Sequence, residues 1–371
     1  MAQTTAPLHL ATEDEQPERM VRFRKVERND VLAVAGAAVG SFALVWLLFT
    51  QLTAAGVNLG MVIAWYATFL VMVWCIGREQ YDAVRARDFV ARVLFWSAGL
   101  LIAVPMIAIS VYVIGKGISG LSAHFFTQDA RLVGPTSPLS VGGAAAAIVG
   151  TLEQVAIAVL ISVPLGVTVA VYLNEIGGPL ARSVRTVVDA MSAIPSIVAG
   201  LFIYAAIIVA FHSQPHGIWA GLALAVLMLP TVTRTTEVVL RLVPGGLREA
   251  GLALGATEWS TTKNVVVPTA RAGIVTAVIL GVARVVGETA PLLVTTLGAN
   301  AVNWNPFRAQ QSALPLYVYQ QFLLAQPTTV QRAWTGALVL LVLVLVLFVT
   351  ARLIGGRGPG HISRFRRARL A

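Results

Sequence analysis

The chain has 371 residues, of which 57% are hydrophobic and only 12% charged, with a formal net charge of +10 and a mean hydropathy of +0.78. Soluble globular proteins carry roughly 25% charged residues, so this composition excludes a soluble globular domain. The single cysteine, Cys75, excludes an internal disulfide, and residues 1–30 lack the apolar stretch of a signal peptide. An all-α, polytopic membrane protein is therefore predicted.

Eight apolar runs approach the roughly 20 residues that a membrane-spanning helix needs. In chain order they cover residues 31–50, 58–76, 92–114, 146–173, 187–211, 218–232, 272–297 and 333–354. The sixth run is the shortest and ends in the polar sequence MLPTVTR. The last run has no charge before Arg352 and is expected to face lipid or to pack against other helices.

The positive charge is distributed unevenly along the chain. If the amino terminus is cytoplasmic and the sides alternate, most of the 27 Lys and Arg residues fall in cytoplasmic segments, and only Arg284 falls inside a span. This asymmetry follows the positive-inside rule and predicts that both termini are cytoplasmic. The basic sequence RFRRARL near the carboxyl terminus is then expected to face anionic lipid head groups rather than nucleic acid.

The cytoplasmic segment 233–271 is predicted to hold two short helices. After a break at Pro244-Gly245-Gly246, the sequence LREAGLALG forms an amphipathic helix closed by Gly255, because glycine accepts a left-handed backbone. Thr257 suits the N-cap of a second helix, EWSTTKNVVV, which is expected to stop before Pro268.

Two loops are candidate docking surfaces. In the cytoplasmic segment, Leu252, Leu254 and Trp259 are expected to form an exposed apolar knob that a groove of a soluble partner receives. The external segment 303–322 mixes aromatic residues with prolines. It is either a packed surface loop or a docking surface for an external partner.

A charged pair stands inside the seventh apolar run. Arg284 lies 12 residues into it, roughly 18 Å from the cytoplasmic end and near the middle of the bilayer, and Glu288 is expected one turn further on the same face. Gly281 and Gly287 flank the pair, and Pro291 predicts a kink or break. Three interpretations remain open: a structural ion pair that staples spans, a waypoint for an anion with Glu288 holding the guanidinium, or a protonatable relay at Glu288.

Other polar residues and prolines within the spans carry weaker signals. Glu153 is either a partly hydrated gate residue or an interfacial acid, and Asp189 is expected to pair with Arg185. Three further prolines mark bends that are either gating points or static kinks: Pro164, Pro195 and Pro230. The sequence has no P-loop motif, metal-ligand spacing or nucleophile elbow, so neither ATP binding, a metal site nor catalysis is expected of this chain.

Several motifs resemble those of a known transporter family. Glu249-Ala250-Gly251, then Gly255, then Val265-Val266-Val267-Pro268 resemble the "EAA" loop of ABC importer permeases, with Gly in place of the second Ala and valines in place of Ile and Leu. The sequences GTLEQVAIAVLISVPLGVTVAVYLNE (150–175), AIPSIVAGLFIY (193–204), GVARVVGETAPLL (281–293) and SALPLYVY (312–319) resemble the PstA family of phosphate-specific importer permeases. The resemblance covers about residues 92–354.

The resemblance implies a domain organisation and a function. It implies a six-span permease core at 92–354, preceded by a polar segment (1–30) and an extra helix pair (31–91), and followed by a basic tail (355–371). By the same resemblance, the chain is a non-catalytic inner-membrane subunit that transports inorganic phosphate. The implied partners are a PstC-like permease, two PstB-like ATPases that bind ATP and Mg, and a PstS-like phosphate-binding protein.

The resemblance also implies residue roles. Glu249, Ala250, Gly255 and Pro268 would shape the coupling loop, and the apolar knob would dock on the ATPase. It favours the anion waypoint for Arg284 and Glu288. The alternatives are a permease of the same class for molybdate, sulfate or another solute, an ion-coupled secondary transporter that would need no such loop, and a structural or sensory membrane protein.

Overall fold

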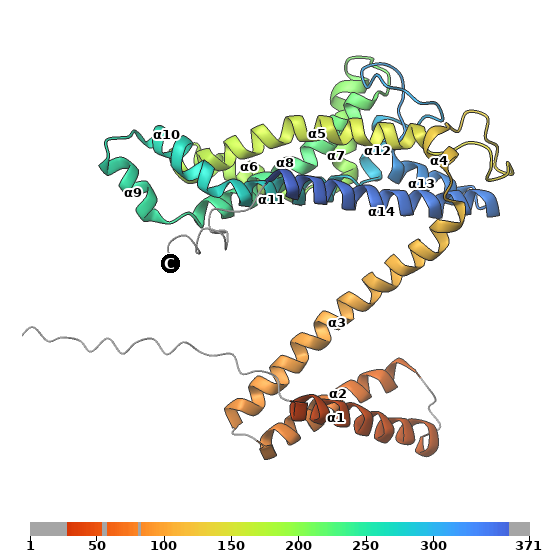
Figure 1. Ribbon diagram of the computed structural model, residues 1–371, viewed down its shortest axis with the longest axis vertical. Helices are drawn as coiled ribbons and strands as arrows, with labels where there is room; N and C mark the ends of the chain where they lie inside the picture. The colour runs from red at the N-terminus through yellow and green to blue at the C-terminus, as the bar shows by residue number, and fades with distance from the viewer. Residues whose placement is uncertain (1–27, 54–57, 81–82, 356–371) are drawn as a thin grey trace, which may run out of the picture. The chain divides into compact units, whose positions relative to one another are not determined.

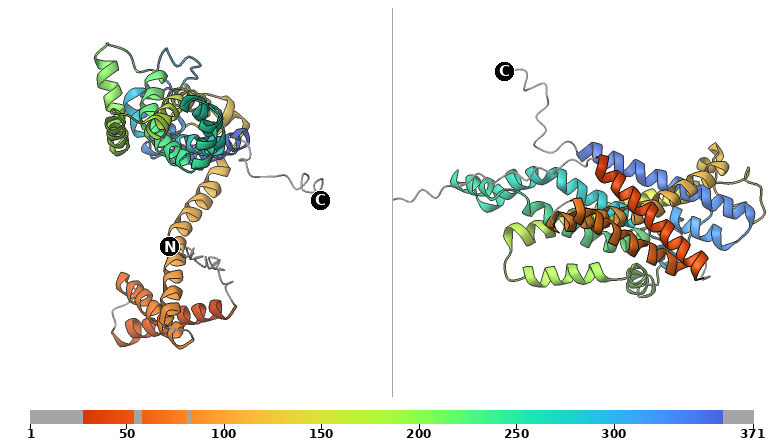
Figure 2. Two further views of the ribbon diagram at one scale, coloured as in Figure 1. Left: turned by 90° about the vertical axis from the view of Figure 1, so that its left-hand side faces the viewer. Right: turned by 90° about the horizontal axis from the view of Figure 1, so that it is seen from below.

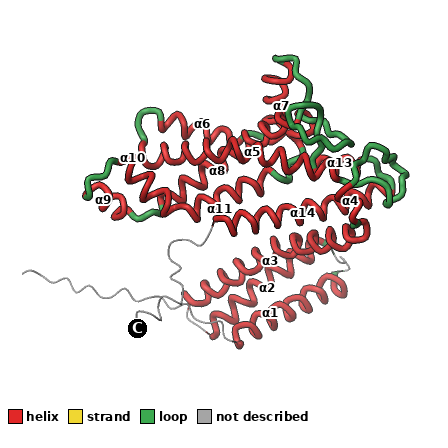
Figure 3. Tube along the Cα trace, turned by 45° about the horizontal axis from the view of Figure 1, so that its top comes forward, coloured by secondary structure: helices red, strands yellow, loops and turns green. Residues whose placement is uncertain are grey.

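The computed structural model describes residues 28–53, 58–80 and 83–355, and every regular element within these ranges is a helix (Figures 1 and 3). The all-α prediction is confirmed for this part of the chain. The predicted polar segment 1–30 and basic tail 355–371 lie almost entirely outside the described residues.

The chain divides into two compact units, with the boundary after Ile107. The first unit holds α1 (Arg28–Leu47), η1 (Leu48–Leu52), α2 (Leu59–Gln80) and the first part of α3 (Ala83–Gly117). Its buried core consists of Ala37, Phe69, Val73, Phe89 and Val93. A hydrogen bond of 2.6 Å joins the hydroxyls of Tyr66 and Ser97. The predicted boundary between residues 91 and 92 falls inside α3 and stays a prediction.

The second unit contains the remaining helices. They are η2 (Ile118–Gly120), α4 (Ala123–Thr127), α5 (Ala145–Val171), η3 (Tyr172–Ile176), α6 (Ala181–Ala193), α7 (Ser196–Ile203), η4 (Tyr204–Val209), α8 (Gly217–Arg241), α9 (Gly245–Ala253), α10 (Glu258–Thr261), η5 (Thr262–Val266), α11 (Val267–Val285), α12 (Ala290–Thr295), α13 (Leu314–Leu323) and α14 (Pro327–Gly355). In Figure 1, α9 and α10 lie at one end of this unit, and α4 and α13 lie at the other.

Helix α8 is the centre of the second unit. It packs along α5 and α11, and α14 packs on α11 (Figure 1). Small residues allow this close approach: a methyl group added at Gly221 would lie 2.7 Å from Ile157, and one added at Gly281 would lie 2.8 Å from Val232. Within lipid, where burial of apolar surface does not itself drive association, such close packing holds helices together.

The predicted membrane spans are recovered with one important change. Seven helices are long and apolar enough to cross a membrane, and an eighth is a pair, Ala181–Ala193 and Ser196–Val209, bent by 107°. The bend predicted at Pro195 within the run 187–211 is therefore confirmed, and the first helix of the pair begins earlier than expected, at Ala181. The residue before Pro195 is extended, as proline requires of its predecessor, and this ends α6. Figure 2 (right) shows α6 lengthwise and the following segment nearly end on.

The sixth predicted span continues beyond its expected end at residue 232, because α8 runs to Arg241. Its last three turns contain charged residues that pair with side chains of the protein, so they do not end the helix. Helical structure is continuous through Pro164 in α5 and through Pro230 in α8, whereas Pro195 and Pro291 stand at the starts of α7 and α12.

The seventh predicted span begins earlier and ends earlier than expected. One continuous helix runs from Glu258 to Val285, and residues 286–289 are not helical. The predicted stop before Pro268 is wrong, because the π-helical turn η5 precedes it and Pro268 stands in the first turn of α11. The π-helical turn directly before Pro268 is where the helix accommodates the missing proline N–H.

Candidate functional site

The two charges of the seventh span stand at a helix break, one at the end of the helix before it and one within it. Arg284 is in the last turn of α11, and Glu288 lies in the non-helical stretch 286–289 before α12. The prediction that both lie on one helix face is wrong, because α11 ends at Val285. The break places irregular backbone beside both charges, as in the broken helices that line transporter sites.

The Arg284 guanidinium has few partners in the described chain. Its Nη1 donates to Thr231 Oγ1 of α8 at 3.1 Å, and the side chain is exposed. Both Arg284 and the half-buried Glu288 are described, yet they form no ion pair with each other. Most of the guanidinium N–H groups are thus without an acceptor among the described residues. The positive charge is therefore not neutralised by an ion pair between spans.

The two short segments that follow the helix breaks pack against each other. A methyl group added at Gly200 of α7 would lie 2.6 Å from Pro291 Cα of α12. Leu292 and Thr295 of α12 are buried. The two short helices are therefore held together by close packing, whereas Pro195 and Gly287 at the breaks themselves are exposed in this chain.

A buried carboxylate on α8 gathers three arginines. Glu237 is 2% exposed and pairs with Arg185 of α6 at 2.7 Å, with Arg234 at 2.9 Å and with Arg241 at 2.5 Å. Arg234 also pairs with Asp189 of α6. The predicted pairing of Asp189 with Arg185 is therefore wrong. The sequence analysis places Arg234, Glu237 and Arg241 in the segment 233–271 after the sixth span, although their i, i+3 and i+7 spacing is typical of one helix face.

Glu153 faces a polar group at the opposite end of the unit. Gln311 Nε2 donates to Glu153 and to the Asn303 carbonyl, and Gln154 Nε2 donates to the Ser312 carbonyl at 3.1 Å. These bonds tie the segment before α13 to α5. Glu153 thus has a structural partner in this conformation.

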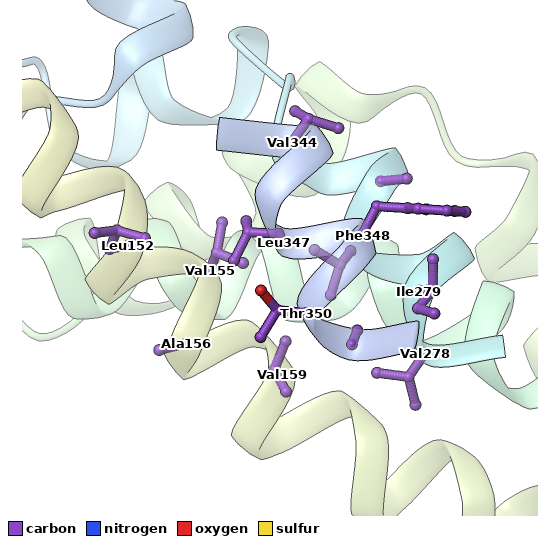
Figure 4. A pocket seen from close by; sticks show the side chains of 13 residues that line it. Leu152, Val155, Ala156, Val159, Val278, Ile279, Val344, Leu347, Phe348 and Thr350 are labelled. Atoms are coloured by element: carbon purple, nitrogen blue, oxygen red, sulfur yellow. The ribbon is translucent and has the colours of Figure 1, made fainter. Parts of the chain in front are cut away.

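An apolar cavity of about 370 Å³ lies between α5, α11 and α14 (Figure 4). Its lining includes Leu152, Val155, Ile279, Val344 and Phe348. Thr350 contributes a hydroxyl, but no charged side chain lines the cavity, so a buried anion would lack a compensating charge. The cavity suits hydrocarbon and is not a site for a charged solute.

The turn between α9 and α10 has the predicted chemistry, although the second helix continues into α11. Gly255 follows α9 with a φ of +82°, and the Thr257 hydroxyl accepts from the Ser260 N–H at 3.2 Å at the start of α10. Leu254 is 89% exposed, and Leu252 and Trp259 are exposed beside it. The predicted apolar knob therefore stands at the surface, and Glu249 and Ala250 are exposed too.

Close packing joins the two helices of this loop. A methyl group added at Gly251 would lie 2.8 Å from Thr261 Cγ2 and 2.9 Å from its hydroxyl. The glycine in this position, which departs from the E-A-A pattern, is therefore matched by the branched side chain opposite it.

A bidentate ion pair fastens α9 to the rest of the unit, and sequence reasoning missed it. Arg248 Nε and Nη2 donate to the Glu175 carboxylate at 2.9 and 2.7 Å, and the same guanidinium donates to the carbonyls of Leu240 and Val243. The hydrogen bonds to Glu175 raise the pKa of Arg248 above its usual value. The strut links the loop to the end of α5 and the end of α8.

Comparison with known proteins gives one consistent result. Residues 162–357 match the family described as binding-protein-dependent transport system inner membrane component. The phosphate transport system permease protein PstA of Mycobacterium leprae is 38% identical over 262 residues, which cover 70% of this chain and 86% of that protein. PstA 1 of Mycobacterium tuberculosis strain H37Rv is 36% identical over 272 residues, covering 73% and 88%.

Replacing Arg248 by Gln is expected to loosen the α9 strut. Hydrogen bonds to charged groups contribute about 1.5–3 kcal/mol, and the buried Glu175 carboxylate would lose its cation. The purified protein should melt at a lower temperature, and protease should cleave between residues 242 and 257 sooner. Arg271→Gln, which removes a charge from α11 without breaking an ion pair, is the control. Equal melting of the two variants would contradict the strut.

Gly251→Ala is expected to push α9 away from α10, since its methyl group would overlap Thr261. Overpacking of this kind costs about 1–3 kcal/mol. A second change, Thr261→Ala, removes the opposing atoms and should restore the stability of the loop. Thermal unfolding of the single and double variants measures this, and failure of the double variant to recover would refute the packing argument.

Proposed function

The chain belongs to the binding-protein-dependent transport system inner membrane component family, and on that basis we propose that it is the permease subunit of an ATP-driven phosphate importer of the bacterial inner membrane. The PstA relatives support phosphate as the solute. The single structural observation that carries the chemistry is the exposed Arg284 guanidinium, which has no carboxylate partner beside a helix break. A guanidinium fork matches two phosphate oxygens at once.

Arg284 and Glu288 then have different roles. Arg284 offers its remaining N–H donors to the anion as it passes between the two permeases. Glu288 lies four residues on, in the non-helical stretch 286–289, and its negative charge keeps the anion from binding too tightly. An importer needs this balance, because a solute that binds too strongly does not leave.

Energy reaches the permease through the cytoplasmic loop. The apolar knob of Leu252, Leu254 and Trp259 enters a groove of a separate ATPase, which binds ATP and Mg²⁺. Closure of an ATPase dimer moves α9, and the Arg248–Glu175 strut passes the movement to α5 and α8. This subunit itself is not catalytic.

Three kinds of partner complete the assembly. A homologous PstC-like permease covers the face that carries Arg284, and two PstB-like ATPase copies bind below. Outside, a PstS-like phosphate-binding protein docks on the loop before α13, where Trp304 and Phe307 are exposed.

Arg284→Gln is expected to reduce phosphate uptake by the reconstituted complex about ten- to a hundredfold, the equivalent of one charged hydrogen-bonding group. Arg284→Lys keeps the charge but loses the fork, so it should retain an intermediate rate. Uptake of radiolabelled phosphate, with sulfate and molybdate as competitors, measures both. Normal uptake by Arg284→Gln in an assembled complex would remove the pathway role, and stronger competition by sulfate or molybdate would reassign the solute.

Leu254→Glu is expected to detach the ATPase, since burying a carboxylate in an apolar groove is unfavourable. Copurification of the ATPase should fall at least tenfold. The matched control is Leu132→Glu, which changes an equally exposed leucine (91%) in the segment between α4 and α5 at the other end of the unit. If both variants copurify the ATPase like the unmodified protein, the knob is not the docking surface.

A further inference from the structure

A charged stripe runs along α8 from Thr231 toward the cytoplasmic loop. Thr231, Arg234, Glu237 and Arg241 are separated by three, three and four residues, which keeps them on one side of the helix. The stripe starts at the Arg284 guanidinium, because Thr231 accepts its hydrogen bond. It spans ten residues, or about 15 Å at 1.5 Å per residue.

The acid of this stripe is buried, and its cations are not. Glu237 is 2% exposed, whereas the side chains of Arg185, Arg234 and Arg241 are 41%, 34% and 57% exposed. The carboxylate therefore lies behind the guanidinium groups and holds them. The surface presents these three arginines together with the Asp189 carboxylate, which pairs with Arg234 and is 55% exposed.

The arginines have hydrogen-bonding capacity to spare. Arg185 and Arg241 each use only Nη2 toward Glu237, and the buried Arg185 Nε has no acceptor. Three guanidinium charges face two carboxylates, those of Glu237 and Asp189, which leaves the group net positive. Holding α6 on α8 would require only one such pair, so the excess of cations points to an anionic ligand.

We propose that the three guanidinium groups around Glu237, those of Arg185 on α6 and of Arg234 and Arg241 on α8, form a second phosphate-binding site. This site, called the stripe below, receives the anion from Arg284 on its way to the cytoplasm. The inference rests on the proposed function and names the route on the cytoplasmic side. Two guanidinium groups can bind one divalent oxyanion through paired N–H donors. Glu237 lowers the net charge of the site, so the anion is held weakly enough to leave.

The experiment measures binding of radiolabelled inorganic phosphate to the purified complex in detergent, without nucleotide. It is done in an Arg284→Gln background, so that the bound phosphate reports on the stripe. Arg185→Gln and Arg241→Gln each leave Glu237 two arginine partners, and each should weaken phosphate binding at least fivefold. Glu237→Gln removes the neutralising charge and should strengthen it by a similar factor. Arg271→Gln is the matched control and should bind phosphate like the background.

The opposite signs separate a binding site from a structural network, because a network that only holds α6 would not strengthen binding when Glu237 is changed. If Glu237→Gln fails to assemble, the two arginine variants decide alone. The proposal is overturned if the Arg284→Gln complex binds no phosphate, or if Arg185→Gln and Arg241→Gln match the control.

The same purified complexes distinguish two other outcomes: binding of a lipid head group by the arginines, and failure of the proposed function. If added anionic phospholipid displaces the phosphate from the stripe and is retained there, the arginines bind a lipid head group, and the proposal is overturned. If the unmodified complex takes up no phosphate at all, the proposed function fails. If the unmodified complex takes up phosphate normally but the stripe variants bind phosphate like the control, this inference alone is overturned.

Discussion

Glu237 is a carboxylate enclosed within a membrane protein, and such a charge is stable only when cations hold it. Three arginines do so, one of them from α6. This requirement fixes α6 against α8 and keeps the last three turns of α8 helical despite their charge. Because α8 is the centre of the second unit, the orientation of this one carboxylate determines how the cytoplasmic half of the unit is arranged.

The same constraint governs the helix breaks. Backbone groups freed within a membrane need protein or water as partners. The helices that follow the two breaks, α7 and α12, pack against each other through Gly200 and Pro291, while Pro195 and Gly287 at the breaks are exposed. Arg284 stands at the edge of this packed region, exposed and close to α8, where a guanidinium can contact a solute without being neutralised.

A connected set of polar contacts joins the two ends of the proposed mechanism. The apolar knob lies on the loop that holds Arg248, and Arg248 binds Glu175 of η3 and the carbonyls of Leu240 and Val243. Those carbonyls belong to the end of α8 that also carries Glu237. Thr231, which binds Arg284, lies two turns earlier on the same helix and is joined to this end only by the backbone of α8. In the proposed mechanism, movement of the loop therefore reaches Glu237 through ion pairs and hydrogen bonds and reaches Arg284 through the rigid helix α8.

Local patterns in the sequence determined the helical class, the number of spans and the turn between α9 and α10. Run length and hydropathy predicted an all-α membrane protein with about eight spans, and Gly255 and Thr257 predicted the helix–turn–helix, because a helix cap depends only on neighbouring residues. Tertiary structure decided what depends on partners distant in sequence. The continuation of α8 past residue 232, the choice of Glu237 for Arg185 and the Arg248–Glu175 strut all require charges brought together by packing. Likewise, Pro291 predicted a kink or break in the seventh span, but the end of α11 at Val285, which separates Arg284 from Glu288, is not marked by any residue of the local sequence.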